Sequence, residues 1–251
     1  MIASLPMYLR TENKGEHRDL WAGFRDVFGS GAPAVLSEPQ TLEDHWSDSD
    51  LFLSQTCGLP YRAGLHEKVT LVGLPDYGLP GVKPGFYFSV LVARRGDPRR
   101  TLAEFEGAGL AVNDTLSQSG WAAPQEAARA AGLAAFGVGA LTGSHRASAI
   151  AVAEGTADLA AIDAVTWRLI TQWDAVAPTL KVVAKTSPTP GLPMITARNR
   201  DPVPIAEALR QVIGDLAADV RLRLGGLRKL VPVEPNAYLS MPMPPFPSAV
   251  R

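Results

Sequence analysis

The stretch that decides the fold runs from residue 110 to residue 120 and reads Leu110-Ala111-Val112-Asn113-Asp114-Thr115-Leu116-Ser117-Gln118-Ser119-Gly120. Its three apolar residues predict a buried strand, and the hydroxyl-rich residues behind them precede an alanine-rich helix from Pro124 to Ala131. Gly132, just beyond that helix, is typical of a helix end. A strand that passes through a short polar loop into a helix is the basic unit of an α/β sheet.

The same alternation of strands and helices continues along the rest of the chain. Ser144 is expected to cap a helix from His145 to Glu154, and Gly155 to end it. Gly137-Val138-Gly139 follows no predicted strand, so it does not indicate a dinucleotide-binding loop. The apolar pattern further predicts strands at residues 2–8, 51–54, 69–74, 86–93, 159–162 and 180–184, and helices at residues 19–28, 166–173 and 202–220.

The order of these elements predicts an α/β protein with two lobes. Strands that alternate with helices indicate mixed, mostly parallel sheets with helices on both faces. A polar connection at residues 94–98 separates two such series, and the late helix after Asp201 indicates a return to the first. We therefore expect residues 1–90 and 188–251 to build lobe 1 and residues 95–183 to build lobe 2, with hinge crossovers near residues 87–94 and 181–187.

Composition excludes several classes of protein. The formal net charge of the 251 residues is −1 with both signs scattered, which argues against a nucleic-acid partner. Cys57 is the only cysteine, so an intrachain disulfide and a thiolate zinc cluster are excluded. The four histidines lack metal-ligand spacing, and no nucleophile elbow, P-loop or zinc-protease motif occurs. We therefore expect no cofactor, no metal and no catalytic residue.

The first residues bear on localisation. A secretory leader needs a basic segment and an apolar core of about 7–15 residues. Here residues 2–8 run straight into the polar stretch Arg10-Thr11-Glu12-Asn13-Lys14, and no run approaches the roughly 20 apolar residues of a membrane span. As written, the chain is expected to be cytoplasmic and not inserted in a membrane. It would be periplasmic if a leader had been removed.

Candidate binding residues follow from strand ends. In open α/β sheets, ligands lie beyond the carboxyl ends of the strands. Helix N-termini there offer N–H groups and favour an anion by about 0.3–1 kcal/mol. Asn113, Ser117, Ser119 and Gly120 lie between a strand and a helix, and His145 begins the next helix, so they could share one anion. Alternatively, the serines only cap their own helix, and His145 is an ordinary satisfied histidine.

Other candidates also have two interpretations. Asp163 ends a strand, where it could hold a ligand ammonium or could cap the next helix through the N–H of Thr166. Tyr8 and Tyr87 could line an apolar part of a cleft or could be core aromatics. The remaining candidates at or near strand ends are Gln55, Thr56, Trp167 and the pair Thr186-Ser187.

Three segments taken together resemble the phosphonate-type substrate-binding proteins of ABC importers. They are residues 110–120, the tripeptide Gly143-Ser144-His145, and residues 160–167, in that order and spacing; residues 3–8 and 186–188 also fit. The resemblance covers most of the chain and implies the type II periplasmic-binding fold, with two lobes joined by two crossovers. It implies that Ser117, Ser119 and His145 hold the phosphonate oxygens. It also implies that Asp163 holds a ligand amine and that Tyr8 faces the cleft. The implied partners are a small anionic ligand and an ABC permease.

Two classes of function remain open on this resemblance. Family members that serve importers carry a leader or lipid anchor, which this sequence does not show, so a cytoplasmic relative is one interpretation. The fold is also similar to that of cytoplasmic enzymes of menaquinone and thiamine-precursor biosynthesis. The first expectation is an ABC-transporter-type protein, or its cytoplasmic relative, that binds a phosphonate-like or phosphate-like anion between its lobes. The alternative is an enzyme on the same scaffold.

Overall fold

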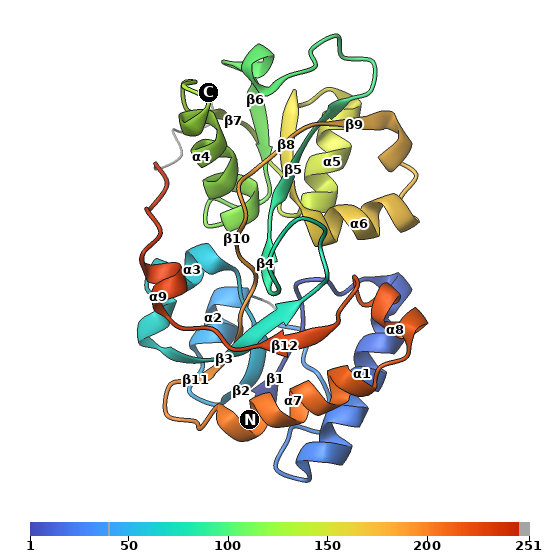
Figure 1. Cartoon of the computed structure of the whole chain (residues 1–251), viewed down its shortest axis with the longest axis vertical. Helices are drawn as coiled ribbons and strands as arrows, with labels where there is room; N and C mark the ends of the chain where they lie inside the picture. Colours follow the sequence, from blue (N-terminus) through green and yellow to red (C-terminus); the bar gives the residue numbers. More distant parts are fainter. Residues whose placement is uncertain (40, 246–251) are drawn as a thin grey trace. The chain divides into compact units, whose positions relative to one another are not determined.

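The computed structural model describes residues 1–39 and 41–245 and divides the chain into two compact units (Figure 1). Unit 1 consists of Met1–Phe86 and Pro190–Met241, and unit 2 of Tyr87–Thr189 together with residues 242–245. The chain thus passes into unit 2 after Phe86 and leaves it after Thr189. At these two passages the short strands β4 (Phe86–Tyr87) and β10 (Thr189–Pro190) pair with each other.

The sheet of unit 1 has the strand order β1-β2-β11-β3-β12. Its strands are β1 (Ile2–Ala3), β2 (Leu51–Gln55), β3 (Val69–Asp76), β11 (Met194–Ala197) and β12 (Lys229–Val231). β1 and β2 are parallel, whereas β11 runs antiparallel to β2 and β3, and β12 antiparallel to β3. The carboxyl ends of β1, β2 and β3 therefore share one edge of this sheet.

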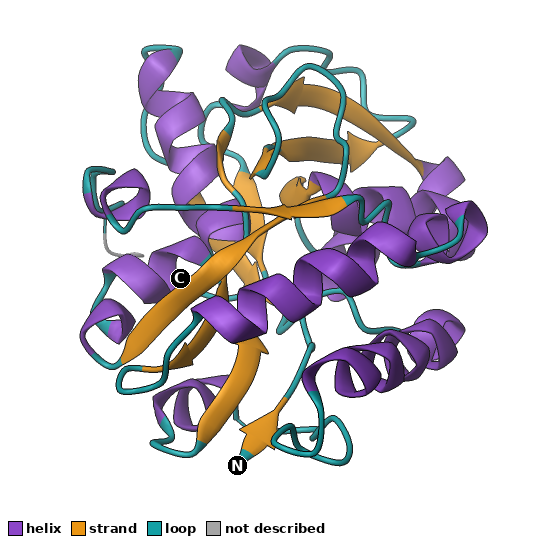
Figure 2. Cartoon of the chain, turned by 60° about the horizontal axis from the view of Figure 1, so that its bottom comes forward, coloured by secondary structure: helices purple, strands orange, loops and turns teal. Residues whose placement is uncertain are grey.

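Helices cover both faces of the unit 1 sheet (Figure 2). On one face α1 packs against α7, with Trp21 stacked on Phe24 at 4.8 Å and both rings edge-on to Phe52. On the other face Trp46, Tyr61 and Tyr238 pack on the strands. The helices are α1 (Lys14–Phe28), α2 (Leu42–Ser47), α3 (Gly58–Arg62), α7 (Val203–Asp215), α8 (Ala218–Arg223) and α9 (Asn236–Leu239), with 3-10 turns at Thr11–Asn13 and Leu65–Glu67.

The sheet of unit 2 has the order β7-β6-β8-β5-β9. Its strands are β5 (Ser89–Arg94), β6 (Gly109–Val112), β7 (Gly137–Leu141), β8 (Leu159–Asp163) and β9 (Leu180–Lys185). β6 is parallel to β7 and β8, and β5 is antiparallel to β8 and β9, with Ser89 opposite Asp163. The carboxyl ends of β6, β7, β8 and β9 and the amino end of β5 therefore share one edge.

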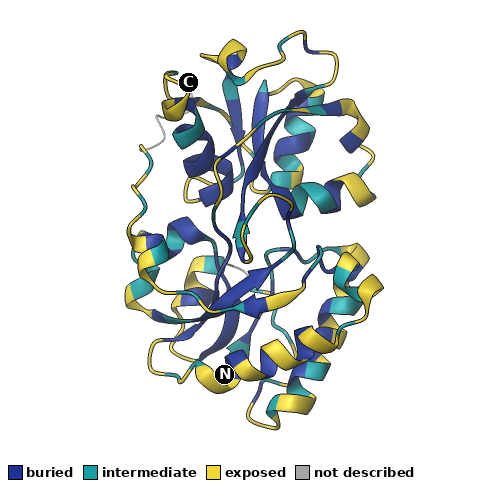
Figure 3. Ribbon diagram, viewed as in Figure 1, coloured by how far each residue is buried: buried dark blue, intermediate teal, exposed yellow. Residues whose placement is uncertain are grey.

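Helices also cover both faces of the unit 2 sheet, and its three central strands, β5, β6 and β8, are largely buried (Figure 3). Trp121 and Ala128 pack with Leu110, Val112 and Phe105 in one core cluster. Val152 and Leu169, from α5 and α6, are also buried. The helices are the π-helical turn η4 (Gln118–Ala122), α4 (Ala123–Ala130), α5 (His145–Glu154) and α6 (Ala164–Trp173), with 3-10 turns at Leu102–Phe105 and Ala177–Thr179.

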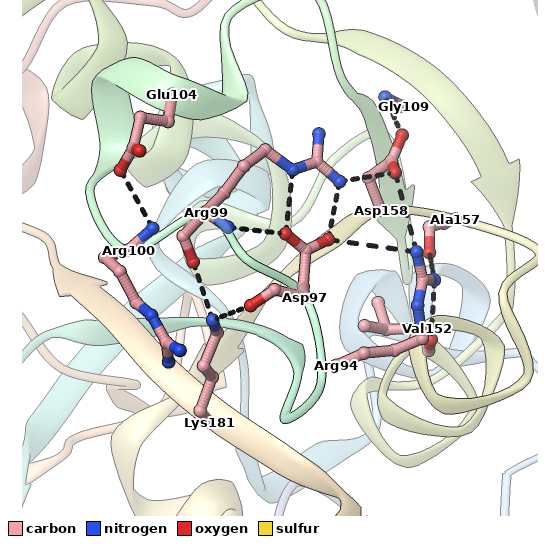
Figure 4. Close-up of polar contacts among 10 residues, drawn as sticks. All are labelled: Arg94, Asp97, Arg99, Arg100, Glu104, Gly109, Val152, Ala157, Asp158 and Lys181. Carbon is pink, nitrogen blue, oxygen red and sulfur yellow. Dashed lines mark hydrogen bonds and ion pairs between the residues drawn. The ribbon is translucent and has the colours of Figure 1, made fainter.

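The opposite edge of this sheet is held by an ionic network (Figure 4). Arg99 makes two side-chain hydrogen bonds to Asp97, of 3.0 and 2.7 Å, and one of 2.8 Å to Asp158. Lys181 donates to the carbonyl oxygens of Asp97 and Arg99, and Asp158 accepts from Gly109 N–H at 3.2 Å. The network joins the end of β5 to the starts of β6, β8 and β9. It fixes the strands whose other ends carry the candidate site.

Several expected elements differ from those observed. The strand expected at 2–8 is only Ile2–Ala3, because Pro6 has no N–H to donate to a sheet. The strand expected at 86–93 is divided at Phe88 into β4 and β5. The helix expected at 202–220 is two helices, because the backbone is extended at Leu216 and Ala217, where Leu216 O accepts from Arg221 Nε. The sheets are mixed, but antiparallel pairings through β11, β12 and β5 are more frequent than expected.

Two further differences concern glycine and the chain end. Gly137-Val138-Gly139 is part of a strand, β7, that the sequence pattern did not predict. A Cβ on Gly139 would lie 2.9 Å from the backbone of Gly109, so glycine is needed for β6 and β7 to approach. The segment Pro242–Pro245, assigned from sequence to lobe 1, groups with unit 2, where Trp121 Nε1 donates to Pro245 O at 2.9 Å.

Candidate ligand-binding site

The structure brings Ser117, Ser119 and His145 together at the shared strand edge of unit 2. Ser119 Oγ lies 2.8 Å from His145 Nε2 and 3.4 Å from Ser117 Oγ. Ser117 and Ser119 follow β6, and His145 follows β7, the parallel neighbour of β6. Parallel neighbours end at the same edge, which is why loops 26 residues apart in the sequence meet here.

Ser117 caps the helix that follows β6. Its Oγ accepts from Gly120 N–H at 2.9 Å, and its carbonyl accepts from Trp121 and Ala122 N–H at 3.1 and 3.0 Å. Ser117 therefore makes the cap that one of the two interpretations expected, and its role toward a ligand stays a prediction. Ser119 Oγ instead contacts His145 and Ser117. With the N–H of Gly120 held by Ser117, the other first-turn N–H groups are those of Gln118 and Ser119.

The first turn of this helix is a π turn, in which Ala122 donates to Ser117 O and Ala123 to Gln118 O. Pro124 explains the widening. Proline has no N–H to donate to the carbonyl four residues earlier, that of Gly120, and its ring crowds that carbonyl. A π turn relieves the crowding by shifting the acceptors by one residue.

Asn113 and Gly120 are in close contact near Ser117. A Cβ on Gly120 would lie 1.8 Å from Asn113 Oδ1 and 3.2 Å from Ser117 Oγ. Asn113 Oδ1 is itself buried and has no hydrogen-bond partner within residues 1–39 and 41–245. Glycine is therefore required at position 120 by the side chain of Asn113 and not by backbone conformation.

His145 is the first residue of α5, whose N-terminus Ser144 caps by accepting from Ala147 N–H at 3.1 Å. Burial lowers the pKa of His145 to about 4, and the backbone of Ala161 offsets this only in part. Its Nδ1 is buried and makes no hydrogen bond of standard geometry to any described residue. The imidazole is therefore neutral near pH 7, and its Nε2 is engaged with Ser119.

Ser119 is held by Ser89, which was not among the predicted candidates, and Ser89 in turn is held by Thr186. Ser89, at the start of β5, donates from Oγ to Ser119 O at 2.9 Å. Thr186, just after β9, accepts at Oγ1 from Ser89 N–H at 2.9 Å and donates its own N–H to Ser89 O at 2.9 Å. Thr186 was recognised only as a strand-end residue. Ser89 carries no local signal, because it begins an apolar strand.

Asp163 is buried at the end of β8 and caps α6. Its Oδ1 accepts from Val165 N–H at 2.7 Å and from Thr166 N–H at 2.9 Å. The capping role, one of the two interpretations from the sequence, is therefore present. Trp167 is half-buried on α6, and Tyr87 is buried on β4.

Unit 1 holds the remaining candidates at the carboxyl edge of its own sheet. Gln55 is not free, because its Nε2 donates to Leu192 O at 3.0 Å and to Tyr77 Oη at 3.3 Å. The rings of Tyr8 and Tyr77 meet edge to face at 4.8 Å. Thr56 is buried beside them, with a long contact of 3.5 Å from Oγ1 to Cys57 O. Tyr77 was not predicted, since it follows a strand whose end the apolar pattern placed too early.

The described residues contain neither a metal centre nor a membrane span. No three His, Cys, Asp or Glu side chains within 1–39 and 41–245 are grouped so as to hold a metal ion. Among the helices of that part of the chain, none combines the length and hydropathy that crossing a bilayer requires.

Comparison with known proteins identifies the family. The model of the phosphonate ABC transporter periplasmic substrate-binding proteins matches residues 54–238. This chain belongs to that family. The family consists of substrate-binding proteins and not of enzymes, which supports a solute-binding role and the resemblance inferred from sequence. No functionally curated protein matches the sequence significantly.

Solved structures of other binding proteins share the fold. PhnD1 from Prochlorococcus marinus, in complex with methylphosphonate, superimposes with a TM-score of 0.73 at 14% identity, over 95% of this chain and 94% of that chain. A binding protein component of an ABC phosphonate transporter from Pseudomonas aeruginosa superimposes with a TM-score of 0.69 at 18% identity, over 96% of this chain and 83% of that chain. MatC from Rhodopseudomonas palustris, with bound malate, superimposes with a TM-score of 0.63 at 15% identity, over 96% of this chain and 93% of that chain. The expected two-lobed type II periplasmic-binding fold is thus confirmed.

Proposed function

We propose that this phosphonate-family protein binds the anionic head of a phosphonate-like or phosphate-like solute at Ser117, Ser119 and His145 and delivers it, unchanged, to an ABC permease. The observation that carries the proposal is the 2.8 Å contact between Ser119 Oγ and His145 Nε2 at the starts of two helices. Helix N-termini favour anions through their unpaired N–H groups and their dipoles. Two such termini on parallel strands make a site for one oxyanion.

The groups offered to the anion are neutral. Because the pKa of His145 is lowered to about 4, the imidazole carries no charge near pH 7. Binding then relies on hydroxyl and backbone N–H donors, and hydrogen bonds from such donors to a charged acceptor contribute roughly 1.5–3 kcal/mol each. A tetrahedral oxyanion with three terminal oxygens fits several donors converging from two loops. Phosphonate and phosphate are therefore favoured over a planar carboxylate.

An enzymatic role on the same scaffold has one observation in its favour and two against it. The Ser119–His145 contact has the distance of a nucleophile–base pair, which the sequence did not reveal. However, a histidine with a pKa of about 4 is a weak base at neutral pH. The backbone of Ala161, which interacts with the ring, is uncharged and cannot stabilise an imidazolium as the carboxylate of a catalytic triad does. Transport of the intact solute, from the periplasm as in the family, is the better-supported function.

Titration calorimetry on the full chain tests the site directly. Methylphosphonate, inorganic phosphate, sulfate and malate are titrated into the parent and into Ser119→Ala and His145→Ala. Loss of one hydrogen bond to the charged group predicts about 10- to 150-fold weaker binding of the preferred anion. Thr171→Ala is the matched control, because this exposed hydroxyl of unit 2 bonds only within its own helix. If both site variants remain folded and bind like the parent, the anion site lies elsewhere.

A further inference from the structure

The peptide group between Ser119 and Gly120 is held at both of its polar atoms. Its carbonyl oxygen accepts from Ser89 Oγ at 2.9 Å, and its N–H donates to Ser117 Oγ at 2.9 Å. A peptide group is planar, so two hydrogen bonds in opposite directions fix its orientation. That orientation sets the course of the turn that carries the Ser119 side chain. Ser89 therefore bears on the candidate site without being one of its ligands.

Ser89 also lies at the point where the chain enters the sheet of unit 2, and Thr186 where it leaves. The two residues exchange a pair of hydrogen bonds, Ser89 N–H to Thr186 Oγ1 and Thr186 N–H to Ser89 O, each 2.9 Å. The passages to unit 1 follow within three residues on either side, after Phe86 and after Thr189. Both passages are thus linked to each other immediately next to the site.

These contacts form one continuous series from His145 through Ser119 and Ser89 to Thr186. Ser89, Ser119 and Thr186 are at most 7% exposed, so water does not compete effectively for these bonds. A buried hydrogen bond between two elements restricts their relative movement, since breaking it leaves polar atoms unpaired.

We propose that Ser89 is a positioning residue that orients the Ser119–Gly120 peptide and couples occupancy of the anion site to the two passages between the units. This inference rests on the proposed function, because it requires an anion at Ser119. An anion that draws Ser119 toward it pulls on the Ser89 hydroxyl through the shared peptide. The pull then reaches residues 86–89 directly and residues 186–189 through Thr186.

The test combines affinity with hydrogen–deuterium exchange on the full chain, with and without saturating methylphosphonate. In the parent, the ligand should slow amide exchange at residues 117–123, 86–90 and 186–190. Ser89→Ala should bind about 5- to 150-fold more weakly, as expected for loss of one buried hydrogen bond. At saturation, this variant should keep the slowing at 117–123 and lose it at the two passages. Ser89→Thr, which keeps the hydroxyl, should restore the response.

A second variant separates positioning from simple loss of stability. Thr186→Val removes the acceptor for Ser89 N–H but leaves the Ser89–Ser119 hydrogen bond. The ligand-induced slowing of amide exchange at residues 186–190 should therefore decrease, while the affinity for methylphosphonate changes by less than about threefold. If the parent binds and Ser89→Ala keeps both its affinity and its exchange response, the inference is overturned and the proposed site stands. If the parent binds none of the anions, the proposed function fails and the inference falls with it.

Discussion

Ser119 Oγ lies 2.8 Å from Nε2 of His145, and this contact joins the start of the helix after β6 to the start of the helix after β7. A histidine in such a position would be cationic at mildly acid pH if it were exposed, but here burial keeps it neutral. The neutral state makes the contact a hydrogen bond between uncharged groups. It also makes the folded state sensitive to acid.

The first prediction concerns this acid sensitivity. The folded-state pKa of His145 is about 4, below its usual 6.5, so the unfolded chain binds a proton between these values that the folded chain does not. The free energy of unfolding should therefore fall as the pH drops from 6.5 toward 4. The fall in the free energy of unfolding between pH 7 and pH 5 should be smaller by roughly 1–2 kcal/mol in His145→Gln than in the parent.

Urea denaturation of parent and variant at both pH values measures the difference. His17 and His45, whose pKa values are also lowered by burial, contribute in the same direction and are present in both proteins. Equal pH dependence in parent and variant would show that His145 is not held neutral by the fold.

The second prediction uses the contact between Asn113 and Gly120. Gly120→Ala would place its Cβ 1.8 Å from Asn113 Oδ1, so the loop must shift, and both stability and anion affinity should fall. An overpacked site of this kind costs about 1–3 kcal/mol. Adding Asn113→Ala should restore much of the loss, because the remaining neighbour, Ser117 Oγ, is at 3.2 Å. Thermal unfolding and calorimetry on the single and double variants give the coupling energy.

Gly214→Ala is the control for this double-variant cycle. Gly214 lies within α7, and nothing would lie within 4 Å of an added Cβ. Alanine there should leave binding unchanged and stabilise the chain by up to about 1 kcal/mol. If Asn113→Ala fails to relieve Gly120→Ala, the glycine is required for another reason.

Local signals carried most of what the sequence predicted. Ser144, the helix His145–Glu154 and Gly155 lie where expected, with the Ser144 cap made and Gly155 at a φ of 84°. Gly132 likewise has a φ of 71° beyond α4. Caps and glycine stops depend on neighbours a few residues away, so a single sequence suffices to identify them. The grouping of Ser117, Ser119 and His145 followed from parallel order and from the family resemblance.

Features that depend on distant pairing were not predicted. Ser89 reaches Ser119 because β5 runs antiparallel between β8 and β9, a register that no local pattern encodes. Strand β7 was missed because it contains two glycines, of which Gly139 is needed for the close approach of Gly109, a distant neighbour that no local pattern reveals. The break of the late helix at Leu216 likewise depends on Arg221, which reaches back to its carbonyl.

The third prediction decides between the two roles of Asp163. Because its Oδ1 accepts two N–H groups of α6, Asp163→Ala should lower the free energy of unfolding by about 0.5–2 kcal/mol. If capping is its main role, the variant should bind an alkylphosphonate and an aminoalkylphosphonate of equal length with the same change in affinity. Selective weakening for the amine-bearing ligand, measured by calorimetry, would instead assign Asp163 to the ligand ammonium. Asp163→Asn serves as control, because it keeps an acceptor oxygen for the cap.

The fourth prediction concerns catalysis. A neutral His145 with a pKa of about 4 is a poor general base near pH 7, so bound anions should be released unchanged. Prolonged incubation with methylphosphonate and with phosphate esters, followed by mass spectrometry of the small molecules, should return only the starting compounds. Multiple turnovers that are abolished by Ser119→Ala would favour the enzymatic alternative.

The last prediction tests whether the network at the far edge of the unit 2 sheet supports the site from a distance. Hydrogen bonds from Arg99 lower the pKa of Asp97 from 3.8 to about 2 (Figure 4). A carboxyl group whose pKa is lower in the folded chain than in the unfolded chain stabilises the fold. This contribution to the free energy of unfolding is complete above the pKa of the unfolded chain and is lost as the pH falls from about 4 to 2. Asp97→Asn should therefore lower the free energy of unfolding by about 1–3 kcal/mol at pH 7 and weaken its decline below pH 4.

The same variant distinguishes support of the fold from support of the site. Asp97 lies at the opposite edge of the sheet from Ser119, so its loss should change stability without changing anion affinity by more than about twofold. Glu126→Gln, which breaks an exposed pair with Arg129 on α4, is the control and should alter stability by less than about 0.5 kcal/mol. A large loss of affinity in Asp97→Asn, with the chain still folded, would mean that the strands transmit strain between their two ends, and the site could no longer be treated as independent of the network.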